Sequence, residues 1–113
     1  MITAQDLEPM IEAIKADFKI FMDNDIDESD ENDISYRKWR IRSFNDSIRI
    51  DEGRSYLKVV KDGSVHSFVV RADNNQFKAG DILFPASWKA PAKNFARGNV
   101  FTDLSRVRWS STQ

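Results

Sequence analysis

The sequence predicts an α+β domain in which an N-terminal amphipathic helix packs on an antiparallel meander of three to five strands. Apolar side chains recur at steps of three and four over residues 7–22, which is the spacing of one helix face. Asp62-Gly63 stands between two runs rich in β-branched residues, which is a strong β-hairpin signal. A chain of 113 residues can bury one hydrophobic core, so we expect a single domain over residues 1–113.

The composition excludes several functional classes. The chain contains no cysteine, which excludes disulfides, thiolate catalysis and cysteine-based zinc sites. It contains no apolar run of about 18 residues and no apolar stretch close to Met1, so neither a membrane span nor a secretory signal is predicted. The expected location is therefore a reducing cytoplasm, and nothing in the sequence indicates a cofactor.

The start of the first helix has two interpretations. Thr3 and Asp6 resemble a capping box, but a helix begun at Thr3 would place Pro9 beyond its first turn. With Asp6 as the N-cap, Pro9 falls where no intrahelical N–H bond is lost, so this start and a helix over 7–22 are preferred. The apolar stripe consists of Leu7, Met10, Ile11, Ile14, Phe18, Phe21 and Met22.

The segment 23–33 holds seven carboxylates in eleven residues and is predicted to be a solvated acidic linker. Its alternating aspartates match the first three ligand positions of an EF-hand calcium loop. Glu28 then stands where that loop needs glycine, and Ile34 stands where it needs glutamate, so a metal site is not predicted. The linker could still mimic a polyanion.

Basic and aromatic side chains alternate over residues 34–44. Such a mixture can pair with phosphates and stack on bases, which would make the segment a nucleic-acid contact. The same residues could form a strand with Trp39 and Ile41 inward and the cations outward as a solvated face. The candidate binding residues of this segment are Tyr36, Arg37, Lys38, Trp39, Arg40 and Arg42.

A two-residue hairpin turn sets the register of the central strands. Val59 then faces His66, and Leu57 faces Phe68. His66 has no carboxylate within two residues, and it is the only histidine, so a packed histidine with one hydrogen bond is favoured over a catalytic or metal-binding one. The face expected to form the core carries Leu57, Val59, His66, Phe68 and Val70.

The segment PASWKAPAKNFARGNVF follows an apolar run and is rich in alanine, aromatic and basic residues. Pro91 suits the first position of a helix and Gly98 suits the position after its end, so a short second helix is expected near 91–97. Lys93 and Arg97 would share one face of it and could bind a phosphate or carboxylate. Alternatively, the rings cover one end of the sheet while the cations stay in water. The candidate binding residues here are Trp88, Lys89, Lys93 and Arg97.

Charge is divided along the chain. Residues 1–34 hold 11 acidic and 2 basic side chains, a net charge of −9, whereas residues 35–113 hold 15 basic and 7 acidic side chains, a net charge of +8. Such regions attract oppositely charged partners, or they neutralise each other within the fold. Residues 34–101 are expected to hold the sheet and the PASWKAPA segment, and residues 102–113 a C-terminal tail or edge strand.

The strings SVHSFV and GDILFPASWKAPAKNFARGNVF resemble a recurring pattern in small proteins of tailed bacteriophages. In that pattern a strand of SVxxFV type leads into GDIxxPASWKAPA and an RGN turn. The resemblance covers residues 54–101 and implies a phage origin and a location in the host cytoplasm. It implies no activity and no catalytic residues.

We therefore expect a small, phage-encoded, non-enzymatic binding protein whose basic and aromatic surface engages nucleic acid or an acidic host protein. The sequence contains no familiar motif for a nucleophile, a general base or a metal site, and no membrane partner is expected. The alternative is a protein–protein interaction module, either a host-factor inhibitor or a homodimer, that acts through the acidic segment 23–33.

Overall fold

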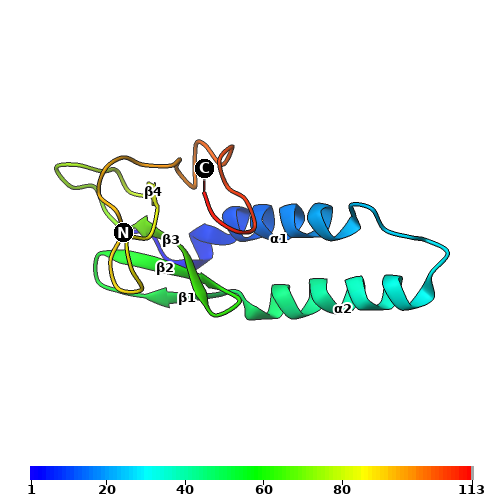
Figure 1. Ribbon diagram of the computed structural model, residues 1–113. Helices are drawn as coiled ribbons and strands as arrows, with labels where there is room; N and C mark the ends of the chain where they lie inside the picture. Colours follow the sequence, from blue (N-terminus) through cyan, green and yellow to red (C-terminus); the bar gives the residue numbers. More distant parts are fainter. Residues whose placement is uncertain (113) are drawn as a thin grey trace.

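A helical hairpin projects from one end of a four-stranded antiparallel sheet in the computed structural model, which describes residues 1–112 (Figure 1). This arrangement confirms the predicted α+β class, the N-terminal helix and the meander. The molecule is elongated, with extents of 55 × 24 × 22 Å. The elements are η1 (Ala4–Leu7), α1 (Glu8–Asp23), α2 (Glu31–Ser47), β1 (Arg49–Glu52), β2 (Tyr56–Lys61), β3 (Ser64–Val70) and β4 (Ile82–Leu83), and the strand order is β1-β2-β3-β4.

The chain enters α1 through a 3-10 turn, which combines the two predicted starts. The backbone N–H of Thr3 donates to the Asp6 carboxylate over 2.8 Å, so the local capping begins at Thr3 and not at Asp6. Pro9 is then the second residue of α1, where its missing N–H leaves no intrahelical bond unmade. The preferred N-cap at Asp6 is therefore wrong, because the 3-10 turn separates the capping residues from Pro9.

The second helix lies at residues 31–47, where the sequence predicted an acidic linker and then a strand. Asp30 caps this helix, since its carboxylate accepts the N–H groups of Asn32 and Asp33. Phe44 packs on α1, and its ring stacks on that of Phe18 with centroids 4.0 Å apart. The strand interpretation of 34–44 is therefore wrong, because the cap and this contact stabilise helix α2.

The predicted hairpin turn is confirmed, but farther from the turn the pairing of the two strands is displaced by one residue. Asp62 and Gly63 have φ angles of 49° and 78°, and the register predicted next to the turn is observed. A β-bulge then inserts His66 into β3, so that Val59 pairs with Ser67. The bulge moves every later side chain of β3 to the opposite face.

The bulge therefore divides the expected core face in two. Leu57 and Val59 face α1, where they belong to a cluster that also contains Val69. Phe68 and Val70, which were expected beside them, lie in a second cluster with Phe77 and Leu83. The helices consequently cover one face of the sheet, and the segment after β3 covers the other face at β3 and β4. On that second face the side chains of Tyr56 and Lys58 on β2 are only half-buried.

Residues 91–97 form no helix, which corrects the second predicted helix. The N–H of Ala92 donates to the carbonyl of Phe84, and the N–H of Arg97 donates to that of Ile82, each over 2.7 Å. These backbone groups bond to the chain around β4, so they are not available for bonds within a helix. Pro91 forms an isolated bridge with Pro85.

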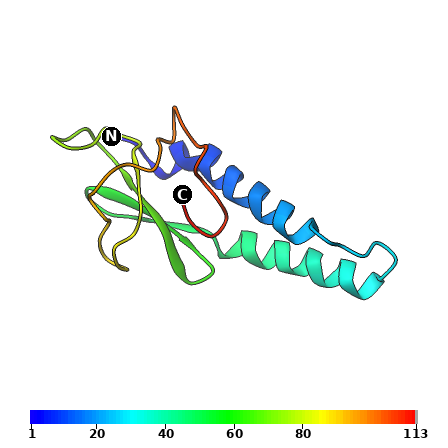
Figure 2. The ribbon, with the colours of Figure 1, turned by 45° about the horizontal axis from the view of Figure 1, so that its top comes forward.

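The chain after β4 is irregular and returns to the helices, so the predicted edge strand is not found at residues 102–112 (Figure 2). The backbone N–H of Trp109 donates to the carboxylate of Asp17 on α1 over 2.8 Å. The Trp109 ring lies edge-on to Phe18 and Phe44, with centroids 5.1 and 5.9 Å away. No helix of residues 1–112 is long and apolar enough to cross a bilayer.

Candidate functional site

Trp88 lies at the tip of a closed loop whose neck is the bridge between Pro85 and Pro91. The Ser87 hydroxyl accepts the N–H of Lys89 over 3.3 Å and the N–H of Ala90 over 3.2 Å, which tightens the tip. The Trp88 side chain is therefore presented outward, and the residue is 45% exposed. The PASWKAP string is thus a loop that displays a tryptophan and a lysine.

Two cations from the sheet lie over the Trp88 ring. The ammonium of Lys58 on β2 is 4.2 Å from the ring centroid, and the guanidinium carbon of Arg49 on β1 is 5.9 Å from it. Arg49 also pairs with Asp51 over 3.0 Å, which holds the pKa of that exposed carboxyl below its usual range. These contacts fix the ring beside positive charge, because cations are attracted to the face of an indole.

A cavity of about 280 Å³ is linked to this ring by Lys58, which lines the cavity and lies over the ring, and by Lys89, the residue after Trp88. Trp88 itself does not line the cavity. Tyr56 and Phe68 supply its aromatic surface, with their rings edge to face and centroids 6.0 Å apart. We call this cavity together with Trp88 the Trp88 groove. Its lining residues are Asp51, Glu52, Gly53, Arg54, Ser55, Tyr56, Lys58, Phe68 and Lys89.

The cations of the Trp88 groove outnumber its available carboxylates. Arg54, Lys58 and Lys89 line it, and no ion pair within residues 1–112 includes any of them. Of the two carboxylates in the lining, Asp51 is already paired with Arg49. The groove can therefore hold an anion beside an aromatic ring.

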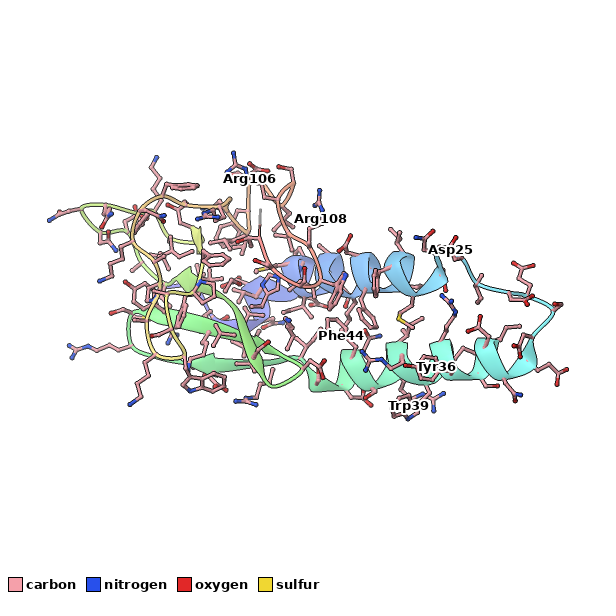
Figure 3. The ribbon with its side chains drawn as sticks, viewed as in Figure 1. Asp25, Tyr36, Trp39, Phe44, Arg106 and Arg108 are labelled. Carbon is pink, nitrogen blue, oxygen red and sulfur yellow. The ribbon has the colours of Figure 1, made fainter. Side chains whose placement is uncertain are left out.

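The residues predicted on the segment 34–44 are spread around helix α2. Tyr36 and Trp39 are each 56% exposed, and their ring centroids are 6.2 Å apart (Figure 3). Lys38 and Arg42 are exposed, whereas Arg40 leans over the Phe18 ring at 5.7 Å. Only part of the predicted set therefore offers a free cation or ring.

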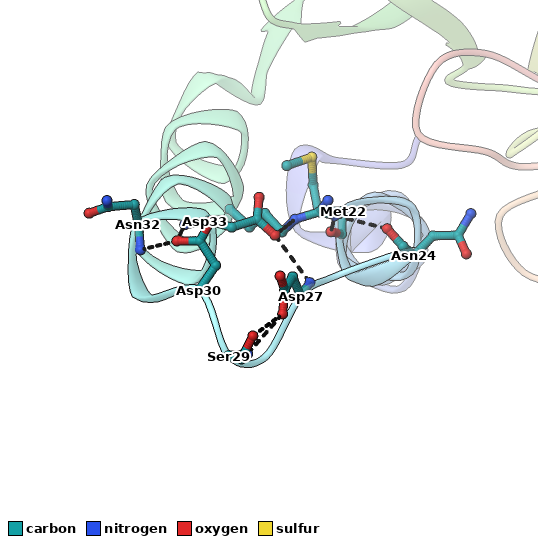
Figure 4. A network of polar contacts seen from close by, with 8 residues as sticks. Met22, Asn24, Asp27, Ser29, Asp30, Asn32 and Asp33 are labelled. Atoms are coloured by element: carbon teal, nitrogen blue, oxygen red, sulfur yellow. Dashed lines mark hydrogen bonds and ion pairs between the residues drawn. The ribbon is translucent and has the colours of Figure 1, made fainter.

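The guanidinium of Arg37 is bonded to other groups within the helical hairpin. It pairs with Asp33 over 3.0 Å and donates to the backbone carbonyls of Met22 and Asn24, which ties the end of α1 to α2 (Figure 4). A guanidinium with three internal partners is a structural group. We therefore assign Arg37 no role in binding a partner.

The predicted residues of the 91–97 segment are also separated from one another. Arg97 packs over the rings of Phe84 and Phe95, at 5.1 and 4.2 Å from their centroids. Lys93 is exposed, and without a helix the two cations do not share a helix face. Within residues 1–112 no ring or cation–ring contact joins Trp88 to Tyr36 or Trp39. The two predicted clusters therefore remain separate.

The acidic segment forms a hydrogen-bonded loop at the tip of the helical hairpin (Figure 4). Asp27 accepts the hydroxyl of Ser29 over 2.6 Å, which lowers the pKa of this exposed carboxyl, and Asp33 accepts the N–H of Asp27. No group of three histidines and carboxylates among residues 1–112 is arranged to hold a metal ion. Several of the carboxylates thus organise the tip itself.

His66 is 1% exposed and bonded on both ring nitrogens. Its Nε2 lies 2.7 Å from the carbonyl oxygen of Arg108, and its Nδ1 lies 2.9 Å from the hydroxyl of Ser67. Burial lowers the pKa of the imidazole, and the carbonyl accepts an N–H, so we assign a neutral ring protonated on Nε2. A packed histidine is confirmed, with two bonds where one was predicted.

Residues 4–112 match a family described as a family of unknown function, DUF7717. The chain belongs to this family. A comparison with curated proteins and one with solved structures each gave no match. The family match covers the hairpin, the sheet and the Trp88 loop together.

Sequence reasoning named Trp88 and Lys89 of the groove and missed Arg49, Arg54 and Lys58. These cations occur singly along the sequence, so no local cluster draws attention to them. The available signal was strand alternation, because Lys58 stands between the buried Leu57 and Val59 and must point to the other face.

Proposed function

We propose that this chain is a small, phage-encoded, non-enzymatic binding protein that holds single-stranded nucleic acid in the Trp88 groove. The observation that carries the proposal is the exposed Trp88 ring beside Lys58, next to a cavity lined by cations that have no internal ion pair. Such a surface can stack a base on a ring while it pairs cations with the adjoining phosphates.

Electrostatics favours the Trp88 groove over helix α2 as the nucleic-acid surface. The segment 23–33 carries seven carboxylates, and Tyr36 lies within two helical turns of it. A polyanion that approached Tyr36 would therefore meet a concentrated negative charge. The groove lies at the sheet end of the molecule, away from this tip.

The size of the cavity and its rings favour a single strand over a duplex. Its volume of about 280 Å³ is near the lower limit of small-ligand pockets, roughly 300 Å³, so it suits one nucleotide unit. Trp88 can stack only on a base that is not already stacked in a duplex. Sequence preference is expected to be weak, because stacking is available to every base.

The phage origin and the location in the host cytoplasm rest on the resemblance of residues 54–101 to phage proteins. The loop that presents Trp88 is formed by the most specific string of that resemblance. The absence of enzymatic activity is part of the proposal. It is supported by His66, whose two ring nitrogens are used in structural bonds and are not available for proton transfer.

The test compares two exposed tryptophans, Trp88 and Trp39, which are 45% and 56% exposed. Fluorescence anisotropy with a labelled oligothymidine measures the dissociation constant of the wild type, Trp88→Ala and Trp39→Ala. Loss of one stacked base costs about 1–3 kcal/mol, so Trp88→Ala should weaken binding by roughly 5- to 150-fold. Trp39→Ala should leave the affinity within about twofold of the wild type.

Salt titration of Lys58→Ala and Lys89→Ala supplies the second measurement. Each substitution removes one phosphate partner, so the slope of log K against log salt should decrease in magnitude by about 0.7. Absence of binding, or equal losses for the two tryptophan variants, would overturn the proposal. If polyglutamate binds as tightly as oligothymidine and depends on Trp88, the partner is an acidic protein and the nucleic-acid assignment is wrong.

A further inference from the structure

One side of the helical hairpin gathers aromatic rings and cations from α1, α2, the β2–β3 turn and the C-terminal segment. On α2, Tyr36, Arg40 and Ser47 are spaced by four and seven residues and so share one helix face. The hydroxyl of Ser47 accepts the N–H of Asp62 over 2.9 Å, which places the β2–β3 turn on this side. The ammonium of Lys61, the residue before Asp62, lies 5.7 Å from the Trp109 ring centroid. Trp109 therefore lies on the same side.

The same surface also includes Phe21 on α1 and Trp39, the neighbour of Tyr36 on α2. The Phe21 ring lies 5.0 Å from that of Trp109, and Phe21 is 54% exposed. Trp39 lies against Tyr36 at 6.2 Å, and both are more than half exposed. We call this surface the hairpin face and define it by Phe21, Tyr36, Trp39, Arg40, Lys61 and Trp109.

We propose that the hairpin face binds the hairpin face of a second copy of this chain, with the two hairpins antiparallel about a twofold axis. In a twofold interface the same patch meets itself, and an antiparallel arrangement places the tip of each hairpin beside the sheet-proximal end of the other. Phe21, Tyr36 and Trp39 of both copies would then be removed from water.

Charge complementarity supports this arrangement. At the tip, Asp25, Glu28 and Glu31 are exposed, and their side chains enter no hydrogen bond or ion pair of residues 1–112. At the other end of the hairpin lie Lys61 and Arg108, and Figure 3 shows Arg108 toward the sheet and Asp25 at the tip. One nitrogen of the Arg108 guanidinium donates to the carbonyls of Ser105 and Val107, but no carboxylate of residues 1–112 pairs with its charge. An antiparallel pair brings each acidic tip to the basic end of its partner. A parallel pair would bring the two acidic tips together, which is unfavourable.

The area available suits a reversible dimer. Helix α1 has 16 residues, and two helices side by side present a face of roughly 24 × 20 Å, or roughly 500 Å² for each copy. The total of roughly 1,000 Å² is at the lower limit for a specific protein interface. We therefore expect dissociation in the micromolar range, where monomer and dimer coexist.

The acidic tip also decides between a second copy and a nucleic acid as the occupant of the hairpin face. The tip would repel a phosphate backbone, whereas it is attracted to the basic end of another hairpin. The inference stands apart from the proposed nucleic-acid site, because the hairpin face and the Trp88 groove share no residue.

Sedimentation equilibrium over the micromolar range tests the proposal. The wild type should fit a monomer–dimer equilibrium, Trp39→Ala should raise the dimer dissociation constant at least about tenfold, and Trp88→Ala should leave it unchanged. Circular dichroism confirms that each variant is folded. A wild type that stays monomeric throughout, or a Trp39→Ala variant with unchanged dimerisation, would overturn the proposal.

A charge-exchange experiment tests the antiparallel arrangement. Glu28→Lys with Glu31→Lys reverses the tip, and Lys61→Glu with Arg108→Glu reverses the other end. Each double variant alone should dimerise more weakly than the wild type, and the mixture should form a heterodimer more strongly than either variant alone. A mixture that associates no better than the separate variants would reject the antiparallel pairing. Because these measurements use no nucleic acid, their failure leaves the test of the Trp88 groove unaffected.

Discussion

The imidazole of His66 donates from Nε2 to the backbone carbonyl of Arg108 over 2.7 Å, which joins strand β3 to a segment 42 residues later. His66 is the extra residue of the β-bulge and has no partner on β2, and its ring is bonded to the C-terminal segment instead. Trp109, the next residue, then packs on Phe18 and Phe44 of the hairpin. One buried histidine therefore helps to position the C-terminal segment.

The stability of the fold is expected to depend on the protonation of His66. Burial lowers its pKa from an ordinary value of 6.5, so near that pH the unfolded chain binds more protons than the folded chain. The contribution of the neutral His66 ring to the free energy of unfolding is therefore complete above about pH 6.5. It is lost as the pH falls below that value, with a slope of up to about 1.4 kcal/mol per pH unit. Urea unfolding at pH values of about 5.5 and 7.5 measures the difference.

His66→Gln is the matched variant, because it can keep a hydrogen bond and cannot titrate. It should be less stable than the wild type at neutral pH and should show a much smaller change over the same interval. Asp27, Asp51 and Asp103 have pKa values lowered from 3.8, so they change the free energy of unfolding only at a lower pH than His66 does. An equal pH dependence in His66→Gln would show that other groups cause the effect.

The stacked Phe18 and Phe44 rings should dominate the stability of the hairpin. Phe18 is fully buried, and its ring also meets Trp109. Phe18→Ala should lower the free energy of unfolding by about 3–5 kcal/mol, because it removes a large ring and leaves a cavity. Phe101→Ala, at a residue that is 57% exposed, should change it by less than about 1 kcal/mol. Chemical denaturation measures the free energy of unfolding of both variants. Similar losses in Phe18→Ala and Phe101→Ala would contradict the dominant role of the stacked rings.

Two glycines with positive φ should respond differently to alanine. A Cβ at Gly98 would lie 2.5 Å from the carbonyl oxygen of Asp103, and its φ is +139°. Gly63 has a φ of +78°, but a Cβ there meets nothing within 4 Å. Gly98→Ala should therefore cost about 2–4 kcal/mol and Gly63→Ala about 1 kcal/mol, measured by thermal or urea unfolding. A larger cost at Gly63 would contradict the close approach at Gly98.

Helix α2 was missed because its sequence carries few apolar side chains and two of its largest rings are exposed. Tyr36 and Trp39 point to solvent, so they disturb the helical spacing of Ile34, Ile41 and Phe44. The usable signal was Asp30, an acidic N-cap followed by further acids in the first turn. The opposite error occurred at 91–97, where cap residues were present but the backbone bonded to the chain around β4.

The sequence alone determined helix α1 and the β2–β3 turn. Both depend on neighbours in the chain, through the apolar spacing of Met10, Ile14 and Phe18 in one case and the positive φ of Asp62 and Gly63 in the other. The division of charge was also evident from the sequence, and the structure places its most acidic segment, residues 23–33, at the tip of the hairpin.

Only the tertiary structure decided which cations are free and which rings they accompany. Arg37 and Arg40 looked alike in the sequence, yet one is bonded inside the hairpin and the other leans over Phe18. Lys58 and Trp88 are 30 positions apart and meet because the loop after β4 folds back onto the sheet. A cation–ring contact acts over a few ångströms in space and carries no fixed spacing along the chain, so no local pattern encodes it.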